Sequence, residues 1–159
     1  MGTSENGKSG GRALMASGPT LAFAAGDTFL ILGPASGKLH LYIALCDQQG
    51  DPPTFIAVPL NTTRFLSDTT VLLQSGDHPF INRETSVSYD LLHQFYVDQL
   101  LQLEGMGPAS GQLLFEMRQR MRPDILQRLV AGALQSDLAP KKLVRMLGAM
   151  LGGVNESQP

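Results

Sequence analysis

One apparent strand carries side chains that suit an anionic ligand. Lys38, His40 and Tyr42 alternate with apolar residues along it, and alternate residues of a strand point to the same face. An ammonium group, an imidazole and a phenol on one face could bind an anion, and the imidazole could transfer a proton near neutral pH. The alternative is a polar face that is simply exposed to solvent.

A turn further along the chain brings a carboxylate and an imidazole together. Asp77 and His78 lie side by side between Gly76 and Pro79. His78 is a second candidate for proton transfer, and Asp77 is a candidate for orienting a reacting group. Arg83 follows closely enough to reach the same place as a substrate-binding residue. The alternative is a common Gly-Asp turn in which the aspartate caps its own backbone.

Polar residues also follow the apolar run 54–60. Asn61, Thr62 and Arg64 lie there, and hydroxyl and guanidinium groups at the end of a strand can position a phosphate. Thr62 is the hydroxyl candidate, whereas Asn61 and Arg64 are candidates for binding substrate. An ordinary polar turn is the alternative.

Other kinds of site have little support. Asp77 and His78 have no partners at metal-ligand spacing, so neither a metal nor a cofactor is expected. The run 33–38 is one residue short of a phosphate-binding P-loop, and a strand follows it where a P-loop has a helix. Cys46 is the only cysteine and lies in an apolar run, which indicates a small buried hydrophobe.

The elements that must position these residues change type along the chain. Between Asp27 and Tyr89, short apolar runs alternate with turn residues, which predicts strands over 28–32, 39–46, 54–60 and 69–73 and a short strand at 87–89. Pro59 in the third run suggests an edge position or the end of pairing. The close spacing of these strands favours a small barrel or a strongly curved sheet.

After Tyr89 the apolar period becomes helical. Helices are expected over about 91–103, 110–121, 124–135 and 140–151, with glycines and prolines between them. This section is rich in methionine and in basic residues. These features are typical of core packing and a solvated face, or of a surface that contacts RNA or an acidic partner. The expected fold class is α+β, with about four helices in a C-terminal helical section.

Composition narrows the class of protein. The chain is 43% hydrophobic and 16% charged, which indicates a folded protein. Its net charge of −2 provides no general basic field for nucleic acid. No apolar stretch approaches the roughly 20 residues of a membrane span. Residues 1–20 are expected to be a disordered lead, because Ser17-Gly18-Pro19 interrupts the apolar core that a signal peptide needs. A cytoplasmic protein is therefore expected.

The order of features from 26 to 103 resembles the MazF/PemK-like toxins of bacterial toxin–antitoxin systems. Gly26-Asp27 with the apolar strand after it looks like their first strand, and the strand 39–46 ends at an aspartate-containing turn. The run 57–63, Ala-Val-Pro-Leu-Asn-Thr-Thr, is similar to their third strand, which ends in threonine or serine. The resemblance implies a curved, SH3-like barrel that is usually dimeric. It divides the chain into a lead (1–20), a barrel body with its first helix (26–105) and a helical extension (106–152).

The resemblance also implies an activity. Toxins of this family are metal-independent endoribonucleases in which the RNA 2′-hydroxyl attacks the adjacent phosphodiester. The family uses an arginine at the start of the second long strand, and here His40 holds that position with Lys38 nearby. Asn61 or Thr62 falls at the position of the family's hydroxyl residue. RNA and an antitoxin-like protein are the partners that the resemblance implies.

Two functions therefore follow as hypotheses. In the first, the chain is a toxin-like RNA-binding or RNA-cleaving protein. His40 and His78 then transfer protons, Thr62 and Asp77 orient groups, and Lys38 and Arg64 hold phosphate. In the second, the chain is a non-catalytic interaction module whose methionine-rich, basic helices bind a protein partner.

Overall fold

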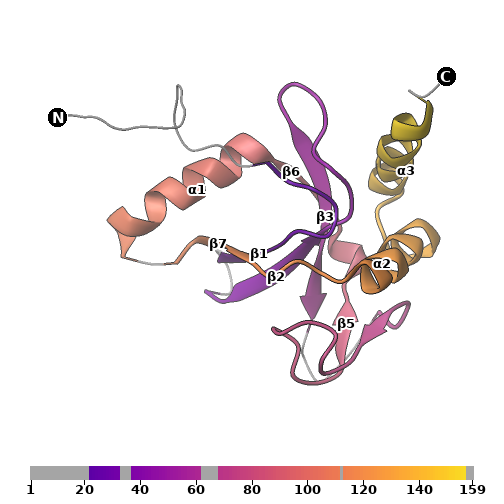
Figure 1. The fold of residues 1–159 in the computed structure, drawn as a ribbon, viewed down its shortest axis with the longest axis horizontal. Helices are drawn as coiled ribbons and strands as arrows, with labels where there is room; N and C mark the ends of the chain where they lie inside the picture. The colour runs from indigo at the N-terminus through magenta and orange to yellow at the C-terminus, as the bar shows by residue number, and fades with distance from the viewer. Residues whose placement is uncertain (1–21, 33–36, 62–67, 112, 157–159) are drawn as a thin grey trace.

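The fold is an antiparallel sheet with helices on both sides (Figure 1). It is a computed structural model that describes residues 22–32, 37–61, 68–111 and 113–156. The lead expected over 1–20 lies outside these residues, as do Thr62 and Arg64. The described strands are β1 (Thr28–Leu32), β2 (Leu39–Ala44), β3 (Thr54–Asn61), β4 (Leu72–Leu73), β5 (Thr85–Val87), β6 (His93–Tyr96) and β7 (Phe115–Arg118). The helices are α1 (Val97–Ser110), α2 (Pro123–Gln135) and α3 (Lys141–Glu156), with a short 3₁₀ turn at Tyr89–Leu91.

The sheet is built around β3. The strand order is β4-β5-β3-β2-β1-β7, and β6 also pairs with β3. One edge of β3 pairs with β2, while its other edge pairs first with β6 and then with β5. Every one of these pairings is antiparallel. The path ends at β4 and β7, and the described strands form an open sheet, not a closed barrel.

Pro59 lies inside this central strand, so of the two expectations for it the edge position is wrong, whereas the pairing of β3 with β2 does end at Pro59. Proline has no backbone N–H and normally interrupts a ladder. The carbonyl of Pro59 accepts a hydrogen bond from the N–H of Ser88 at 2.9 Å. Because the N and C=O of one strand residue point to the same side, the missing donor faces the place where the partner of β3 changes from β6 to β5. The β3–β5 ladder therefore begins only at Leu60, and the Ser88 carbonyl accepts a hydrogen bond from the N–H of Leu91 at 3.0 Å instead.

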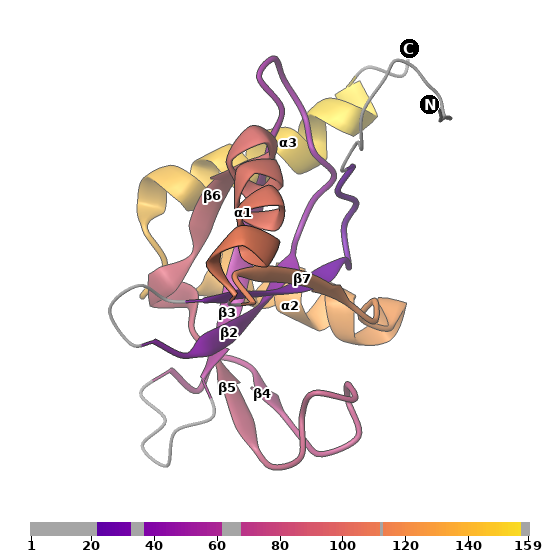
Figure 2. The ribbon, with the colours of Figure 1, turned by 90° about the vertical axis from the view of Figure 1, so that its left-hand side faces the viewer.

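Aromatic rings fill the core on the side of the sheet that α1 covers. Phe29 pairs with Tyr42 and Phe55 pairs with Phe95, which puts these four rings on one face. Phe23 stacks on Phe55 with ring centroids 4.4 Å apart. Figure 2 shows α1 in front of the sheet and α2 with α3 behind it. The core is thus split into an aromatic layer under α1 and a second layer under the two C-terminal helices.

Two segments that were expected to be helical are strands. Phe115–Arg118 falls within the expected helix 110–121, yet it pairs with β1 from Ile31 to Thr28. The local pattern Phe115-Glu116-Met117-Arg118 alternates apolar with charged residues, which is the period of a strand. His93–Tyr96 pairs with β3, and α1 therefore begins only at Val97.

The remaining helical expectations agree with the structure. The helices expected over 124–135 and 140–151 are confirmed as α2 and α3. The described residues therefore contain three α-helices, not about four, and the general α+β class is confirmed. Cys46 is buried, as its apolar neighbours indicated. No helix among the described residues is long and apolar enough to cross a membrane.

The contact between α2 and the 3₁₀ turn fixes α2 against the sheet. Tyr89 is fully buried and donates a hydrogen bond from its hydroxyl to the Leu129 carbonyl at 2.7 Å. Burial raises the pKa of the Tyr89 hydroxyl above its ordinary range, so this group stays a donor. Gly132 lies one helical turn further on, and a Cβ there would come within 2.7 Å of the Val71 side chain as well as meeting the Tyr89 ring. Only glycine allows this approach.

Replacing Gly132 with alanine is expected to destabilise the protein by about 1–3 kcal/mol, because overpacking outweighs the helix propensity that alanine gains. Gly148→Ala is the matched control, since Gly148 is exposed on α3 and nothing lies within 4 Å of a Cβ there. That control is expected to raise stability by up to about 1 kcal/mol. Urea unfolding measures both. A Gly132→Ala protein as stable as the Gly148→Ala protein would contradict this packing.

Candidate functional site

Four of the predicted site residues line two separate hollows. His40 and Asn61 line one hollow on the sheet. Asp77 and His78 line another, between the turn 76–81 and the linker that joins β7 to α2. The two hollows share no lining residue. The structure therefore does not bring the two histidines of the catalytic hypothesis together.

The register of β2 and β3 builds the first hollow, which we call the sheet hollow. Tyr42 pairs with Pro59 in antiparallel strands, so His40 and Asn61, two residues away on each strand, lie at the same level and on the same face. The sheet hollow has a volume of about 300 Å³. Its lining residues are His40, Tyr42, Pro59, Leu60, Asn61, Ser88 and Leu91.

Neighbouring rings hold Tyr42 at the sheet hollow. Its ring lies edge-on to Phe95 at 5.0 Å and stacks on Phe29 at 5.8 Å. Burial raises the pKa of the Tyr42 hydroxyl above its ordinary value, so this phenol keeps its proton at neutral pH. Leu91, 58% exposed, lies at the same hollow. The sheet hollow thus combines an imidazole, an amide and a phenol with apolar surface.

His93 lies on the same face of the sheet, although it was not among the site residues predicted from the sequence. His93 lies in β6 and pairs with Ala57 of β3, and its ring centroid lies 4.5 Å from that of Phe95. Burial lowers the pKa of the His93 imidazole below its ordinary value, so the neutral ring is favoured. From the register, its Cα lies roughly 16 Å from that of His40. His93 therefore extends this face of the sheet. It lies too far from His40 for both imidazoles to act on the same atom of a substrate. The alternation His93-Gln94-Phe95 was the signal for this strand.

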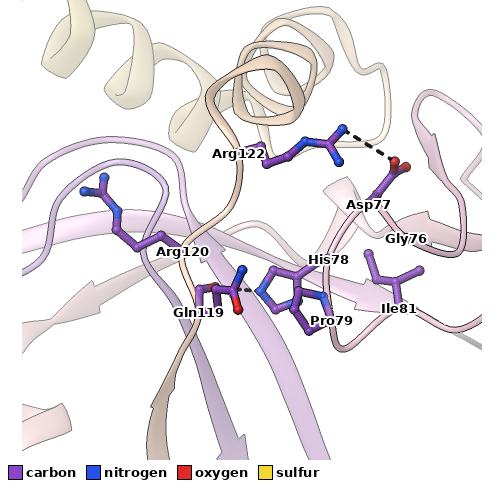
Figure 3. A pocket seen from close by; sticks show the side chains of 8 residues that line it. All are labelled: Gly76, Asp77, His78, Pro79, Ile81, Gln119, Arg120 and Arg122. Carbon is purple, nitrogen blue, oxygen red and sulfur yellow. Dashed lines mark hydrogen bonds and ion pairs between the residues drawn. The ribbon is translucent and has the colours of Figure 1, made fainter.

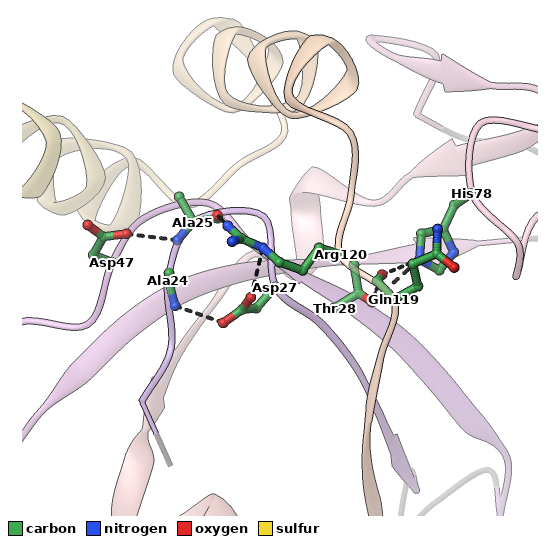
Figure 4. A network of polar contacts seen from close by, with 8 residues as sticks. All are labelled: Ala24, Ala25, Asp27, Thr28, Asp47, His78, Gln119 and Arg120. Carbon is green, nitrogen blue, oxygen red and sulfur yellow. Dashed lines mark hydrogen bonds and ion pairs between the residues drawn. The ribbon is translucent and has the colours of Figure 1, made fainter.

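His78 is buried, and its two ring nitrogens bond to the backbone. Nδ1 accepts a hydrogen bond from the N–H of Phe80 at 3.0 Å, and Nε2 lies 2.6 Å from the Gln119 carbonyl. The Thr28 hydroxyl donates to the same carbonyl at 2.6 Å. Because an N–H can only donate and a carbonyl can only accept, the ring proton is on Nε2. Figures 3 and 4 show this link between the turn and the linker.

The second hollow has a volume of about 350 Å³, and the arginines that line it are paired with carboxylates. Arg122 pairs with Asp124 at 3.1 Å and with Asp77 at 3.9 Å (Figure 3). Arg120 pairs with Asp27 at 3.1 Å and donates to a backbone carbonyl (Figure 4). An incoming anion has to compete with these carboxylates. The arrangement therefore suits a structural role for the Asp77–His78 turn, and a role in proton transfer stays a prediction.

The other two predicted binding residues lie outside both hollows. Lys38 is exposed just before β2, and Arg83 is exposed just before β5. Lys38 is two residues from His40 and so remains close in sequence to the sheet hollow. Among the residues that the structure describes, no three His, Cys, Asp or Glu side chains gather as a possible metal site.

Comparison of the chain with protein-family models, with curated proteins and with solved structures found no match.

His78→Ala is expected to destabilise the protein by about 1–3 kcal/mol, because the Phe80 N–H loses its partner and the Gln119 carbonyl loses one of its two donors. His78→Asn is the matched variant, since its side-chain oxygen can still accept from the Phe80 N–H in an Asx-type turn. It is expected to recover part of the loss. Urea unfolding of the three proteins checks this. Equal stability of His78→Ala and the unmodified protein would show that the link is not structural.

The lowered pKa of His93 predicts a pH effect of defined sign. The unfolded chain binds more protons than the folded one below the unfolded pKa of about 6.5. The stability contributed by neutral His93 is thus present above this pH and is lost as the pH falls towards the lower folded value. Unfolding midpoints at pH 7.5 and 5.5 are expected to differ less in His93→Gln than in the unmodified protein. An equal or larger difference in the variant would contradict this.

Proposed function

We propose that the chain is a toxin-like protein that binds RNA on the open part of the sheet face and cleaves it without a metal ion. The observation that supports this proposal is the convergence of His40, Tyr42 and Asn61 from two adjacent strands in the sheet hollow. The strand order over 26–103 and its resemblance to the MazF/PemK-like toxins are the second support. In this proposal the chain acts in the cytoplasm as a homodimer, and its sheet is a variant of the SH3-like barrel.

The proposed reaction is an internal phosphoryl transfer. The 2′-hydroxyl of one nucleotide attacks the adjacent phosphorus, the O2′–P bond forms and the P–O5′ bond breaks. His40 takes the proton from the 2′-hydroxyl as a general base. The products are a 2′,3′-cyclic phosphate and a free 5′-hydroxyl. No oxidant, metal or cofactor is required for the electron balance.

Tyr42 supplies the proton that the leaving oxygen needs. A phenol with a raised pKa remains protonated at neutral pH and suits a strongly basic alkoxide as its proton acceptor. The Asn61 amide can donate hydrogen bonds to the phosphate oxygens, where negative charge builds up in the transition state. Lys38 adds a positive charge beside the scissile phosphate. Tyr42 thus replaces His78 as the second proton-transfer group.

The face beyond the sheet hollow offers a surface for bases. Phe95 and His93 lie next to Tyr42 along the sheet, and base stacking on such rings contributes about 1–3 kcal/mol per base. The roughly 16 Å between His40 and His93 leaves room for more than one nucleotide. Single-stranded RNA is therefore the substrate that this face fits best, because only unpaired bases can stack on protein rings.

The activity is tested with the full chain and a mixed single-stranded RNA in EDTA. His40→Ala is expected to lower the cleavage rate by about 100-fold or more, and Tyr42→Phe by a similar factor, because each removes one proton-transfer group. Lys142→Gln is the control for the effects of purification and of losing one positive charge, because Lys142 lies on α3 behind the sheet. The Lys142→Gln protein is expected to cleave RNA at the normal rate.

The products and the RNA affinity complete this test. Cleavage by the proposed route leaves 2′,3′-cyclic phosphate ends, which chemical analysis of the fragments detects. The His40→Ala protein is expected to keep most of its affinity for RNA while losing turnover. Absence of cleavage by the unmodified protein, or equal rates for it and His40→Ala, would contradict the proposal.

A further inference from the structure

The cations of α3 differ from the arginines at the linker before α2. Lys141, Lys142 and Arg145 are exposed, and none of them forms an ion pair among the described residues. By contrast, Arg120 and Arg122 each pair with a carboxylate. Residues 138–155 contain no aspartate or glutamate. The first turns of α3 are therefore a local basic surface on a chain whose net charge is −2.

Exposed leucines lie beside these cations. Leu134 at the end of α2 is 45% exposed, and Leu138 in the turn that follows is 52% exposed. A hollow of about 290 Å³ lies between the end of α2 and the start of α3. We call it the α2–α3 hollow, and its lining residues are Leu134, Gln135, Ser136, Asp137, Ala139, Lys141, Val144 and Arg145.

From these features we infer that the α2–α3 hollow docks an acidic, amphipathic helix of a protein partner. Leu134 and Val144 line the hollow and can contact an apolar side chain of the partner. Lys141 and Arg145 can pair with carboxylates that lie one helical turn from that side chain. This is the pattern of helix-in-groove recognition, in which apolar anchors fix the position and flanking charges fix the orientation.

Nucleic acid fits this surface less well than an acidic helix does. Residues 123–156 contain no phenylalanine, tyrosine or tryptophan, so no ring is available for stacking on a base. Exposed leucines beside the cations would also remain in contact with water under a phosphate backbone. A partner with both carboxylates and apolar side chains satisfies both kinds of group.

This docking surface is independent of the proposed RNA chemistry. The two C-terminal helices lie on the opposite side of the sheet from α1 and the aromatic face (Figure 2). A helix bound there leaves the sheet hollow open. The chain can therefore bind a protein on one side and RNA on the other, and either interaction can fail without the other.

The probe is a fluorescent synthetic helix with leucines at positions i, i+3, i+4 and i+7 and glutamates flanking them. Anisotropy titration with the full chain is expected to show saturable binding. Leu134→Ser, which changes a residue that lines the hollow, is expected to weaken it at least about 10-fold. Lys141→Glu and Arg145→Glu are each expected to weaken it about 5-fold or more, because each replaces an attraction with a repulsion.

Lys142→Glu is the matched control, because Lys142 carries the same charge on the same helix but does not line the hollow. It is expected to change the affinity less than Lys141→Glu does. A scrambled peptide of the same composition, a version with lysine in place of glutamate, and a single-stranded RNA are expected to bind at least 10-fold more weakly to this surface. No binding of the acidic helix, equal losses for both lysine variants, or RNA binding that Lys141→Glu abolishes would each overturn the inference.

Discussion

The pairing of β3 on both of its edges is the constraint on which the rest of the structure depends. Its backbone holds β2 along one side and β6 followed by β5 along the other, and its side chains from 55 to 60 are all buried. The register of β3 with its partners therefore places Asn61 beside His40 of β2, and it places His93 of β6 on the same face of the sheet. Pro59 fits because its missing donor lies where the partner strand changes. A register shift of one residue would turn these side chains to the opposite face.

The sheet also separates the two interactions that we propose. Its aromatic face combines rings, imidazoles and an amide, which suit the bases and phosphates of RNA. The helices on the other side have exposed leucines and cations that form no ion pair within the described part of the chain, and they contain no aromatic residue, which suits an acidic helix. The Asp77–His78 turn belongs to neither surface, because its charges are balanced by neighbouring arginines and its imidazole is bonded to the backbone. His78 joins this turn to the linker before α2, and its role in proton transfer stays a prediction.

Much of the fold could be predicted from local patterns, and the failures have a common cause. The first three strands are short apolar segments bounded by turn residues, and the helices α2 and α3 have apolar residues at the helical period of 3.6, so these elements were predicted. The strands β6 and β7 are four residues each and lie beside or between leucine-rich segments whose spacing also fits a helix. Their local alternation spans only four residues, so the pairing with β3 and β1, which are distant in sequence, decides their type. The role of His78 was hidden for the same reason, since its partner Gln119 lies 41 residues away.

The central claim is that single-stranded RNA binds at the His40–Asn61 end of the sheet. Backbone NMR of the full chain, titrated with an oligonucleotide whose 2′-hydroxyls are replaced by hydrogen, tests this directly, because such a strand can bind but cannot be cleaved. We expect saturable shifts concentrated in β2, β3 and β6 and small shifts in α2 and α3. Two results would contradict it. One is a set of shifts confined to α2 and α3, and the other is the absence of shifts at oligonucleotide concentrations at which ordinary RNA saturates the protein.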